Sequence, residues 1–398
     1  MKALAKSLMC VAMAACSAVA FTGCDNDSES SATTAPQITN STGASTQGLT
    51  AAPATADEVP TNPAYNFTKL KQDTDSITAK FDNTLVASKF RGTVYYKLGN
   101  DFEYIGNNGY ADKGSHTYNS LNTNYYIGSL TKQFTAVAVM ILQEQDKLST
   151  DDTLDKYYPD YKYGPDITIR NLLTMTTGLP DYLGKSDESV RANAPQYDIS
   201  ENNSAKDNHS VILKWILSQE IDNDEENYRY SNSDYFILGD IIEKVSGKSY
   251  EEFLKENIFE PLEMTSTTFE STDQLATGYQ DIFDDEWNIY PGVAYSSTGL
   301  ISNLSDLLKW TDAITGSELL SAKSKEEMFT PYKSSFACGL YVDDCGNYYC
   351  DAAFYRFNAR IVFAQDQSKV FIAFSNYTQS NPKAVNKELD EILKPYLK

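Results

Sequence analysis

The order of helical and strand-like segments predicts an α/β protein of the α+β class, with an antiparallel sheet flanked by helices and a helical subdomain. Three observations support this class. Strand patterns occur near both ends of the folded part, helical patterns fill about residues 150–290 between them, and no internal repeat is visible. Strands from the two ends can share one sheet if the helical segment is an insertion between them.

The individual elements follow from hydrophobic periodicity and from turn residues. Residues 67–88 have helical spacing, and 90–98 and 102–110 read as two strands joined by a Gly-Asn-Asp turn. Apolar residues recur at helical spacing from Ser129 to about Lys147. The remaining elements are expected in this order: a short helix at 166–174, a helix closed by Gly247, a helix opened by the capping box Ser249–Glu252, a helix at 304–314, strands at 336–342, 348–355, 359–365 and 369–375, and a helix at 383–396.

Composition restricts the possible functions. The 398 residues are 41% hydrophobic and 12% aromatic, which predicts a packed globular core. A net charge of −22 argues against a nucleic-acid partner, because such binding needs basic stripes. The two histidines, His116 and His209, lie in polar stretches and are expected at the surface. They are too few for a Ser-His-Asp mechanism or a multi-histidine metal site, so we expect no metal and no other cofactor.

The N-terminus reads as an export signal. Residues 1–23 begin with two lysines and continue as an apolar segment that is too short to span a membrane. The segment ends in Phe-Thr-Gly-Cys24, which resembles the lipobox of bacterial lipoproteins; Cys16 is an alternative attachment point. Residues 24–66 are poor in large apolar residues and predict a flexible linker before a folded domain at 67–398. We expect an extracytoplasmic protein, attached to a bacterial membrane by its lipid anchor only.

Three cysteines lie outside the signal, at Cys338, Cys345 and Cys350. An exported protein can form disulfides. If a hairpin turns at residue 344, Cys338 faces Cys350, and we expect a disulfide between them. Three single pairings remain open.

Ser129-Leu-Thr-Lys132 is a Ser-x-x-Lys motif. Positions i and i+3 share a helix face, so the hydroxyl and the amine can meet. In the first turn of a helix, the free N–H groups and the helix dipole favour an oxyanion and a lowered lysine pKa. A neutral lysine can then take the serine proton, as a histidine does elsewhere.

Tyr230-Ser-Asn232 is the chain's one Tyr-x-Asn and precedes a helix. A phenol beside a lysine can relay a proton to a leaving group. The asparagine amide can hold a substrate amide or carbonyl. Alone, the tripeptide is uninformative, and a loop followed by a helix cap explains it better than a catalytic role.

Together the two motifs and their surroundings resemble the serine β-lactamase-related family, which includes class C β-lactamases and penicillin-binding proteins. The resemblance runs in matching order from about residue 67 to 375. It implies the β-lactamase/transpeptidase-like fold, with Ser129 as nucleophile, Lys132 as its proton acceptor, Tyr230 as general acid and base, and Asn232 as a substrate-binding residue. The segments that carry it are Tyr126-Ile-Gly-Ser-Leu-Thr-Lys-Gln-Phe-Thr-Ala, Leu148-Ser-Thr-Asp-Asp, Ile167-Thr-Ile-Arg-Asn-Leu-Leu-Thr-Met-Thr-Thr-Gly-Leu-Pro, Tyr230-Ser-Asn-Ser-Asp-Tyr-Phe-Ile-Leu-Gly and Glu256-Asn-Ile-Phe-Glu-Pro-Leu-Glu-Met.

The family's third motif is degenerate in this chain. In the family, a lysine or histidine followed by Thr or Gly and then Gly lines the cleft, and the matching stretch here is expected at Asp351-Ala352-Ala353. Asp351 would repel a substrate carboxylate and favour protonated Tyr230. The backbone N–H groups of Ser129 and Phe354 remain available for an oxyanion hole, and Asp351, Ala353 and Phe354 are expected to contact substrate.

Three functional readings follow. The first is a serine hydrolase that forms an acyl-Ser129 intermediate on an ester or amide, its substrate a small molecule or peptide such as a cell-wall fragment. Asp351 favours a neutral ester or an amide with a cationic end. The second is a non-catalytic, penicillin-binding-protein-like surface lipoprotein that binds a peptide or cell-wall ligand. The third is a structural adhesin. The persistence of Ser129, Lys132, Tyr230 and Asn232 favours the hydrolase.

Overall fold

A computed structural model describes residues 66–183, 205–222, 228–280 and 293–397. The expected signal, Cys24 and nearly all of the expected linker lie outside these ranges. Among the helices that the structure describes, none has both the length and the hydropathy that a bilayer-spanning helix needs.

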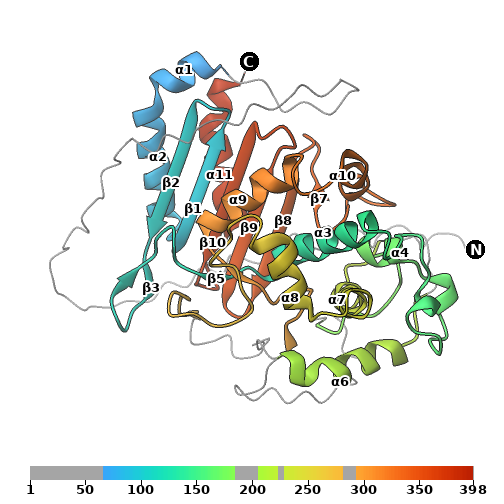
Figure 1. The fold of residues 1–398 in the computed structure, drawn as a ribbon. Coiled ribbons are helices and arrows are strands. Elements are labelled where there is room, and N and C mark those ends of the chain that lie inside the picture. Colours follow the sequence, from blue (N-terminus) through green and yellow to red (C-terminus); the bar gives the residue numbers. More distant parts are fainter. Residues whose placement is uncertain (1–65, 184–204, 223–227, 281–292, 398) are drawn as a thin grey trace, which may run out of the picture. The chain divides into compact units, whose positions relative to one another are not determined.

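A six-stranded antiparallel sheet forms the centre of the fold (Figure 1). The strand β1 pairs with β10, so the first and last long strands lie side by side, and the helical segment is inserted between them. This arrangement confirms the expected α+β class. The strand order is β2-β1-β10-β9-β8-β7, with bounds β1 Gly92–Leu98, β2 Phe102–Asn108, β7 Tyr341–Val342, β8 Tyr348–Phe354, β9 Phe357–Phe363 and β10 Lys369–Ser375.

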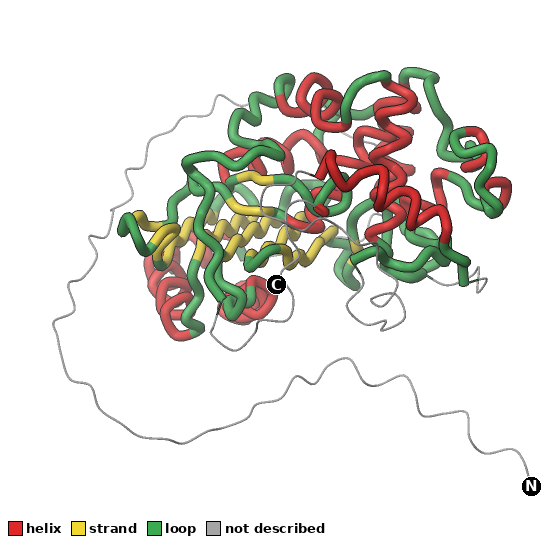
Figure 2. The backbone as a smooth tube through the Cα atoms, turned by 90° about the horizontal axis from the view of Figure 1, so that it is seen from below, coloured by secondary structure: helices red, strands yellow, loops and turns green. Residues whose placement is uncertain are grey.

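Helices cover both faces of the sheet (Figures 1 and 2). On one face, α2 (Thr74–Ala87) and α11 (Pro382–Leu393) share a buried cluster with β1 and β10. On the other face, side chains of β9 and β10 join a larger core with α3 (Thr131–Glu144) and α9 (Leu304–Thr315). Alternate residues of each strand therefore face different helices, because strand side chains alternate with a period of two.

The helical segment packs around α7 (Asn232–Ser246), which has a long run of buried residues. Gly247 closes α7 with a left-handed φ of 71°, and Ser249 forms the expected capping box with Glu252. The other helices and short strands are α1 Phe67–Gln72, α4 Ile169–Leu173, α6 Ala205–Ser218, α8 Tyr250–Leu254, α10 Ala322–Phe329, β3 Tyr110–Asp112, β4 Thr117–Tyr118, β5 Tyr125–Tyr126 and β6 Ile301–Ser302.

The expected disulfide between Cys338 and Cys350 is wrong, because both thiols are free and buried. The hairpin turns one residue later than expected: Tyr341 pairs with Tyr349, which centres it on Cys345. The chain also reverses before β7, where the Ala337 N–H donates to the Leu340 carbonyl. Cys338 consequently packs against α10, its N–H donating to the Met328 carbonyl, while Cys350 lies on β8.

Candidate active site

Ser129 lies in a 3-10 turn, Gly128–Leu130, that leads directly into α3. Lys132 follows in the first α-helical turn, and its Nζ lies 3.4 Å from Ser129 Oγ. The expected Ser-x-x-Lys contact is therefore present. Gly128 has a φ of 52°, and a Cβ there would lie 3.1 Å from Phe354 Cβ. A glycine at this position lets the nucleophile's turn approach the end of β8.

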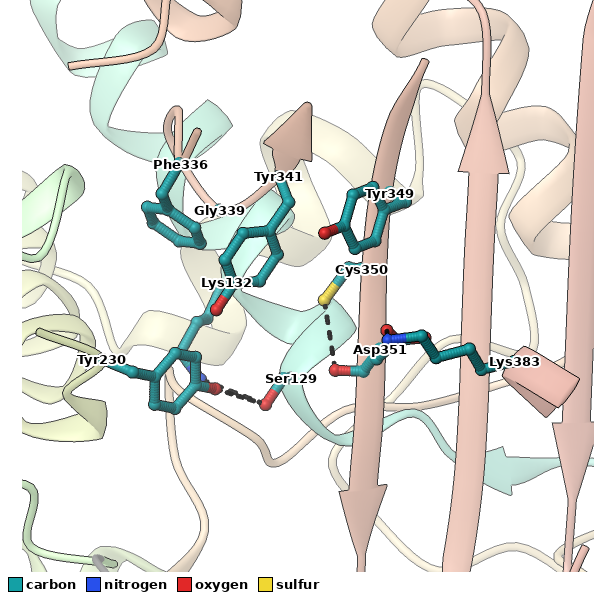
Figure 3. Close-up of a pocket in the computed structure, with 10 residues that line it drawn as sticks. All are labelled: Ser129, Lys132, Tyr230, Phe336, Gly339, Tyr341, Tyr349, Cys350, Asp351 and Lys383. Atoms are coloured by element: carbon teal, nitrogen blue, oxygen red, sulfur yellow. Dashed lines mark hydrogen bonds and ion pairs between the residues drawn. The ribbon is translucent and has the colours of Figure 1, made fainter. Parts of the chain in front are cut away.

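Tyr230 and Asn232 reach the same point from a sequence distance of about a hundred residues. The Tyr230 hydroxyl lies 2.6 Å from Ser129 Oγ (Figure 3). Lys132 Nζ donates to Asn232 Oδ1 at 2.7 Å. The four side chains expected to carry the chemistry or to hold substrate are thus brought together. Asn232, however, contacts the lysine and is not among the residues that line the pocket.

The environment of Lys132 favours the neutral amine. The side chain is 1% exposed. Burial lowers the pKa of its ammonium to about 8, although the Cys350 thiol and the carboxyls of Asp181 and Asp234 oppose this shift. The amine also donates to the Ser297 carbonyl at 2.9 Å. A neutral amine can place its two N–H groups on Asn232 and Ser297 and direct its lone pair at Ser129.

Tyr230 is set up as a neutral phenol. Burial raises its pKa well above the ordinary value, and the hydrogen bond with Ser129 only partly opposes this. A neutral phenol can donate a proton and cannot take one from serine. The geometry therefore suits Lys132 to accepting a proton from the serine and Tyr230 to donating one.

A pocket of about 280 Å³ opens in front of these groups (Figure 3). One wall is aromatic, and the rings of Tyr341 and Tyr349 stack with their centroids 5.3 Å apart. The pocket is lined by Ser129, Lys132, Tyr230, Phe336, Gly339, Tyr341, Tyr349, Cys350, Asp351 and Lys383.

Around the expected third motif, the side chains of β8 alternate between the two faces of the sheet. On β8, Cys350, Ala352 and Phe354 are buried, whereas Asp351 and Ala353 are exposed. Cys350 is consequently the side chain on the face toward Lys132, and both Cys350 and Asp351 line the pocket. Ala353 and Phe354, expected to contact substrate, do not line the pocket.

Asp351 lies at the pocket rim, and its charge is compensated. Arg360 donates to its Oδ1, and Lys383 Nζ lies 3.7 Å from its Oδ2. With two cations against one carboxylate, the rim does not present the uncompensated negative charge expected from the sequence. The expectation that Asp351 repels anionic substrates therefore has no electrostatic support, because the nearby cations offset its charge.

Two residues of the site were missed by the sequence reasoning. Asp181 accepts hydrogen bonds from the Asn232 amide, and it directly follows the Gly-Leu-Pro segment already noted for its resemblance. Gly339 approaches Lys132: a Cβ there would lie 2.9 Å from the Lys132 carbonyl oxygen, and its φ is 81°. The sequence around Gly339 could not predict this contact, because the two segments that approach each other are distant in sequence.

Replacing Gly339 with alanine is expected to destabilise the fold by about 1–3 kcal/mol, through a strained backbone and a clash with α3. Gly247→Ala is the matched control, since Gly247 has a similar φ of 71° but nothing within 4 Å of the added Cβ. Urea unfolding of both variants measures the difference. Equal losses in the two would show that the close approach to Lys132 contributes nothing.

His209, expected at the surface, is partly buried and lies 2.9 Å from Asp240. With Glu243 these residues form a group whose ligand atoms lie within 4.8 Å of one another. Lys244 and Tyr158 both donate to the second oxygen of Asp240. Asp240 thus already has hydrogen-bonding partners at both oxygens, which leaves it poorly suited to a metal ion.

The fold is that of the β-lactamase-related proteins, and it brings a serine hydroxyl into contact with an amine and a phenol. The chain belongs to the Beta-lactamase family, whose model matches residues 85–388.

Individual relatives agree with this assignment. The putative penicillin-binding protein PbpX of Bacillus subtilis is 30% identical over 326 residues, covering 79% of this chain and 78% of that protein. A penicillin-binding protein from Bacillus halodurans has a TM-score of 0.68 at 23% identity, covering 78% of this chain and 99% of that one. The D-amino acid amidase of Ochrobactrum anthropi, complexed with D-phenylalanine, has a TM-score of 0.68 at 20% identity, covering 81% and 98%. The two structures share the fold with this chain.

Proposed function

We propose that the protein hydrolyses an ester or amide through an acyl-Ser129 intermediate. Lys132 takes the serine proton as Oγ attacks the substrate carbonyl, and Tyr230 donates a proton to the departing alcohol or amine. Water then attacks the acyl group and gives its proton to the Tyr230 phenolate, while the Lys132 ammonium returns a proton to Ser129 Oγ as the acid product leaves. The observation that carries this proposal is Ser129 Oγ lying 2.6 Å from the Tyr230 hydroxyl and 3.4 Å from Lys132 Nζ.

The pocket favours an acyl or leaving group with an aromatic or apolar side chain. Phe336, Tyr341 and Tyr349 offer ring faces and edges, against which such a group loses contact with water. The similar D-amino acid amidase, complexed with D-phenylalanine, supports an amide substrate of this kind. The similarity to penicillin-binding proteins supports small peptides, including cell-wall fragments, as substrates. An extracytoplasmic location on a lipid anchor at Cys24 remains part of the proposal.

A covalent probe tests the proposal. The folded protein is expected to react with a fluorescent fluorophosphonate at Ser129, because the probe mimics the tetrahedral acyl-transfer intermediate. Mass spectrometry of the labelled peptide locates the adduct, and Ser129→Ala is expected to carry none. Parallel incubation with a fluorescent penicillin separates a penicillin-binding site from an esterase- or amidase-like one. If folded protein takes up neither probe, the proposal fails and the non-catalytic binding protein is favoured.

A further inference from the structure

Asp181 binds both ends of one neighbouring residue. Its Oδ1 accepts from the Asn232 backbone N–H at 3.1 Å and from the Leu183 N–H at 3.0 Å, and its Oδ2 accepts from Asn232 Nδ2 at 3.0 Å. All three contacts come from N–H groups, which bind the lone pairs of a carboxylate. The side-chain amide of Asn232 is therefore held in one orientation, with its NH₂ group toward Asp181.

This orientation decides which atom of Asn232 meets the lysine. With the NH₂ group on Asp181, the amide oxygen faces Lys132 Nζ at 2.7 Å. If the amide turned over, its NH₂ group would face the amine instead. Two donors would then compete for the lone pair of a neutral lysine: that NH₂ group and the Ser129 hydroxyl.

The lone pair of Lys132 is what the proposed function needs. A neutral amine has two N–H donors and one lone pair, and the described acceptors other than Ser129 number two: Asn232 Oδ1 and the Ser297 carbonyl. Both N–H groups are satisfied, and the lone pair is left for Ser129 Oγ. A turned amide would leave one N–H of the buried amine without its acceptor and divert the lone pair.

We propose that Asp181 is a positioning residue, which holds the Asn232 amide oxygen toward Lys132 so that the lysine lone pair is directed at Ser129. The inference rests on the proposed function. It reassigns Asn232 from holding substrate to holding the base, because both ends of its amide are already engaged by protein groups.

Asp181→Asn is the direct test, because it keeps the size of the side chain and leaves one acceptor oxygen for three N–H donors; with that oxygen on the two backbone N–H groups, an NH₂ group faces the Asn232 amide. The rate of Ser129 phosphonylation is expected to fall by about 10²-fold, by analogy with orienting carboxylates elsewhere. Asp181→Glu, which retains the carboxylate, should keep more of the rate. Asp166→Asn, an exposed position outside the site, is the control and should match the wild type.

Two further measurements separate positioning from a structural role. Removing the Asp181 charge is expected to shift the acidic limb of the pH–rate profile to lower pH, because that charge stabilises the Lys132 ammonium. In an Asn232→Ala background, Asp181→Asn should cause little further loss, since Asp181 acts through that amide.

The outcomes distinguish the two proposals. The role of Asp181 is overturned, and the hydrolase proposal is left intact, if the wild type is labelled at Ser129 and Asp181→Asn is labelled at the same rate. Additive losses in the Asn232→Ala, Asp181→Asn double variant have the same consequence. If Asp181→Asn does not fold, Asp181→Glu decides instead. The role of Asp181 is overturned if folded Asp181→Glu is labelled at Ser129 no faster than Asn232→Ala. An unlabelled wild type overturns the proposed function and this inference with it.

Discussion

Replacing Lys132 with methionine is expected to lower the rate of Ser129 acylation by about 10²- to 10⁴-fold, the usual contribution of a general base. The described structure offers no second base in contact with Ser129 Oγ: the other partner is the neutral Tyr230 phenol. Methionine has a similar length and leaves the pocket filled. Phosphonate labelling and ester hydrolysis measure the loss, and Lys387→Met, an exposed lysine on α11, is the control.

The same variant is expected to change how stability depends on pH. The pKa of Lys132 falls from 10.5 in the unfolded chain to about 8 in the folded one, so the unfolded chain binds more protons between these values. Stability should therefore rise as pH increases from about 8 to 10.5, and the buried ammonium costs about 3 kcal/mol below that window. Lys132→Met should remove this rise and be more stable than the wild type at pH 7.

Urea unfolding at pH 7 and at pH 10 checks the expectation against Lys387→Met. If the variant is more stable than the wild type at pH 7, then burying the Lys132 ammonium lowers the stability of the fold, as is common for groups at active sites. If Lys132→Met acylates at the wild-type rate, Lys132 is not the base. If the stability of Lys132→Met still rises between pH 7 and pH 10 as that of the wild type does, other titratable groups cause the rise.

The sequence predicts the site best where the geometry is local. Ser129 and Lys132 meet because a helical turn joins positions i and i+3, and this could be stated without a structure. Tyr230 lies a hundred residues away, and no spacing rule connects it to Ser129; only the resemblance to a family did so. Element order likewise predicted one sheet built from both ends of the folded part, and the structure adds that β1 pairs with β10.

The expected disulfide failed because facing residues in a hairpin depend on the exact position of its turn. A shift of one residue moves a side chain to the opposite face of a sheet. On β8 this alternation turns Cys350 toward Lys132 and leaves Asp351 exposed at the pocket rim. The hairpin centre was placed one residue too early, and Cys338 was paired across a strand that ends before reaching it.

Asp181 could not be predicted for a different reason. Its role depends on which end of the Asn232 amide it binds, and that is a property of hydrogen-bond geometry alone. The charge compensation of Asp351 is similar, because Arg360 reaches it across a strand pair and Lys383 from the start of α11. Sequence reasoning can name charged residues, whereas their partners come from the fold.

Replacing Tyr230 with phenylalanine is expected to slow amide hydrolysis by about 10²- to 10⁴-fold and to slow hydrolysis of a nitrophenyl ester far less. An amine must be protonated to depart, whereas nitrophenolate leaves as a stable anion. Burial keeps the Tyr230 phenol protonated, so its hydroxyl is suited to donating that proton. Phenylalanine retains the ring, whose centroid lies 4.9 Å from Lys132 Nζ, and the packing around the base is preserved.

Tyr228→Phe is the matched control for this experiment, because it removes a neighbouring hydroxyl that bonds Tyr341 and does not contact Ser129. The comparison of kcat/KM for a matched amide and ester distinguishes the two possible roles of the phenol. Selective loss with the amide assigns Tyr230 to leaving-group protonation. Equal loss with both substrates would contradict that assignment, because a group that activates Ser129 acts before the leaving group departs and must slow every substrate alike.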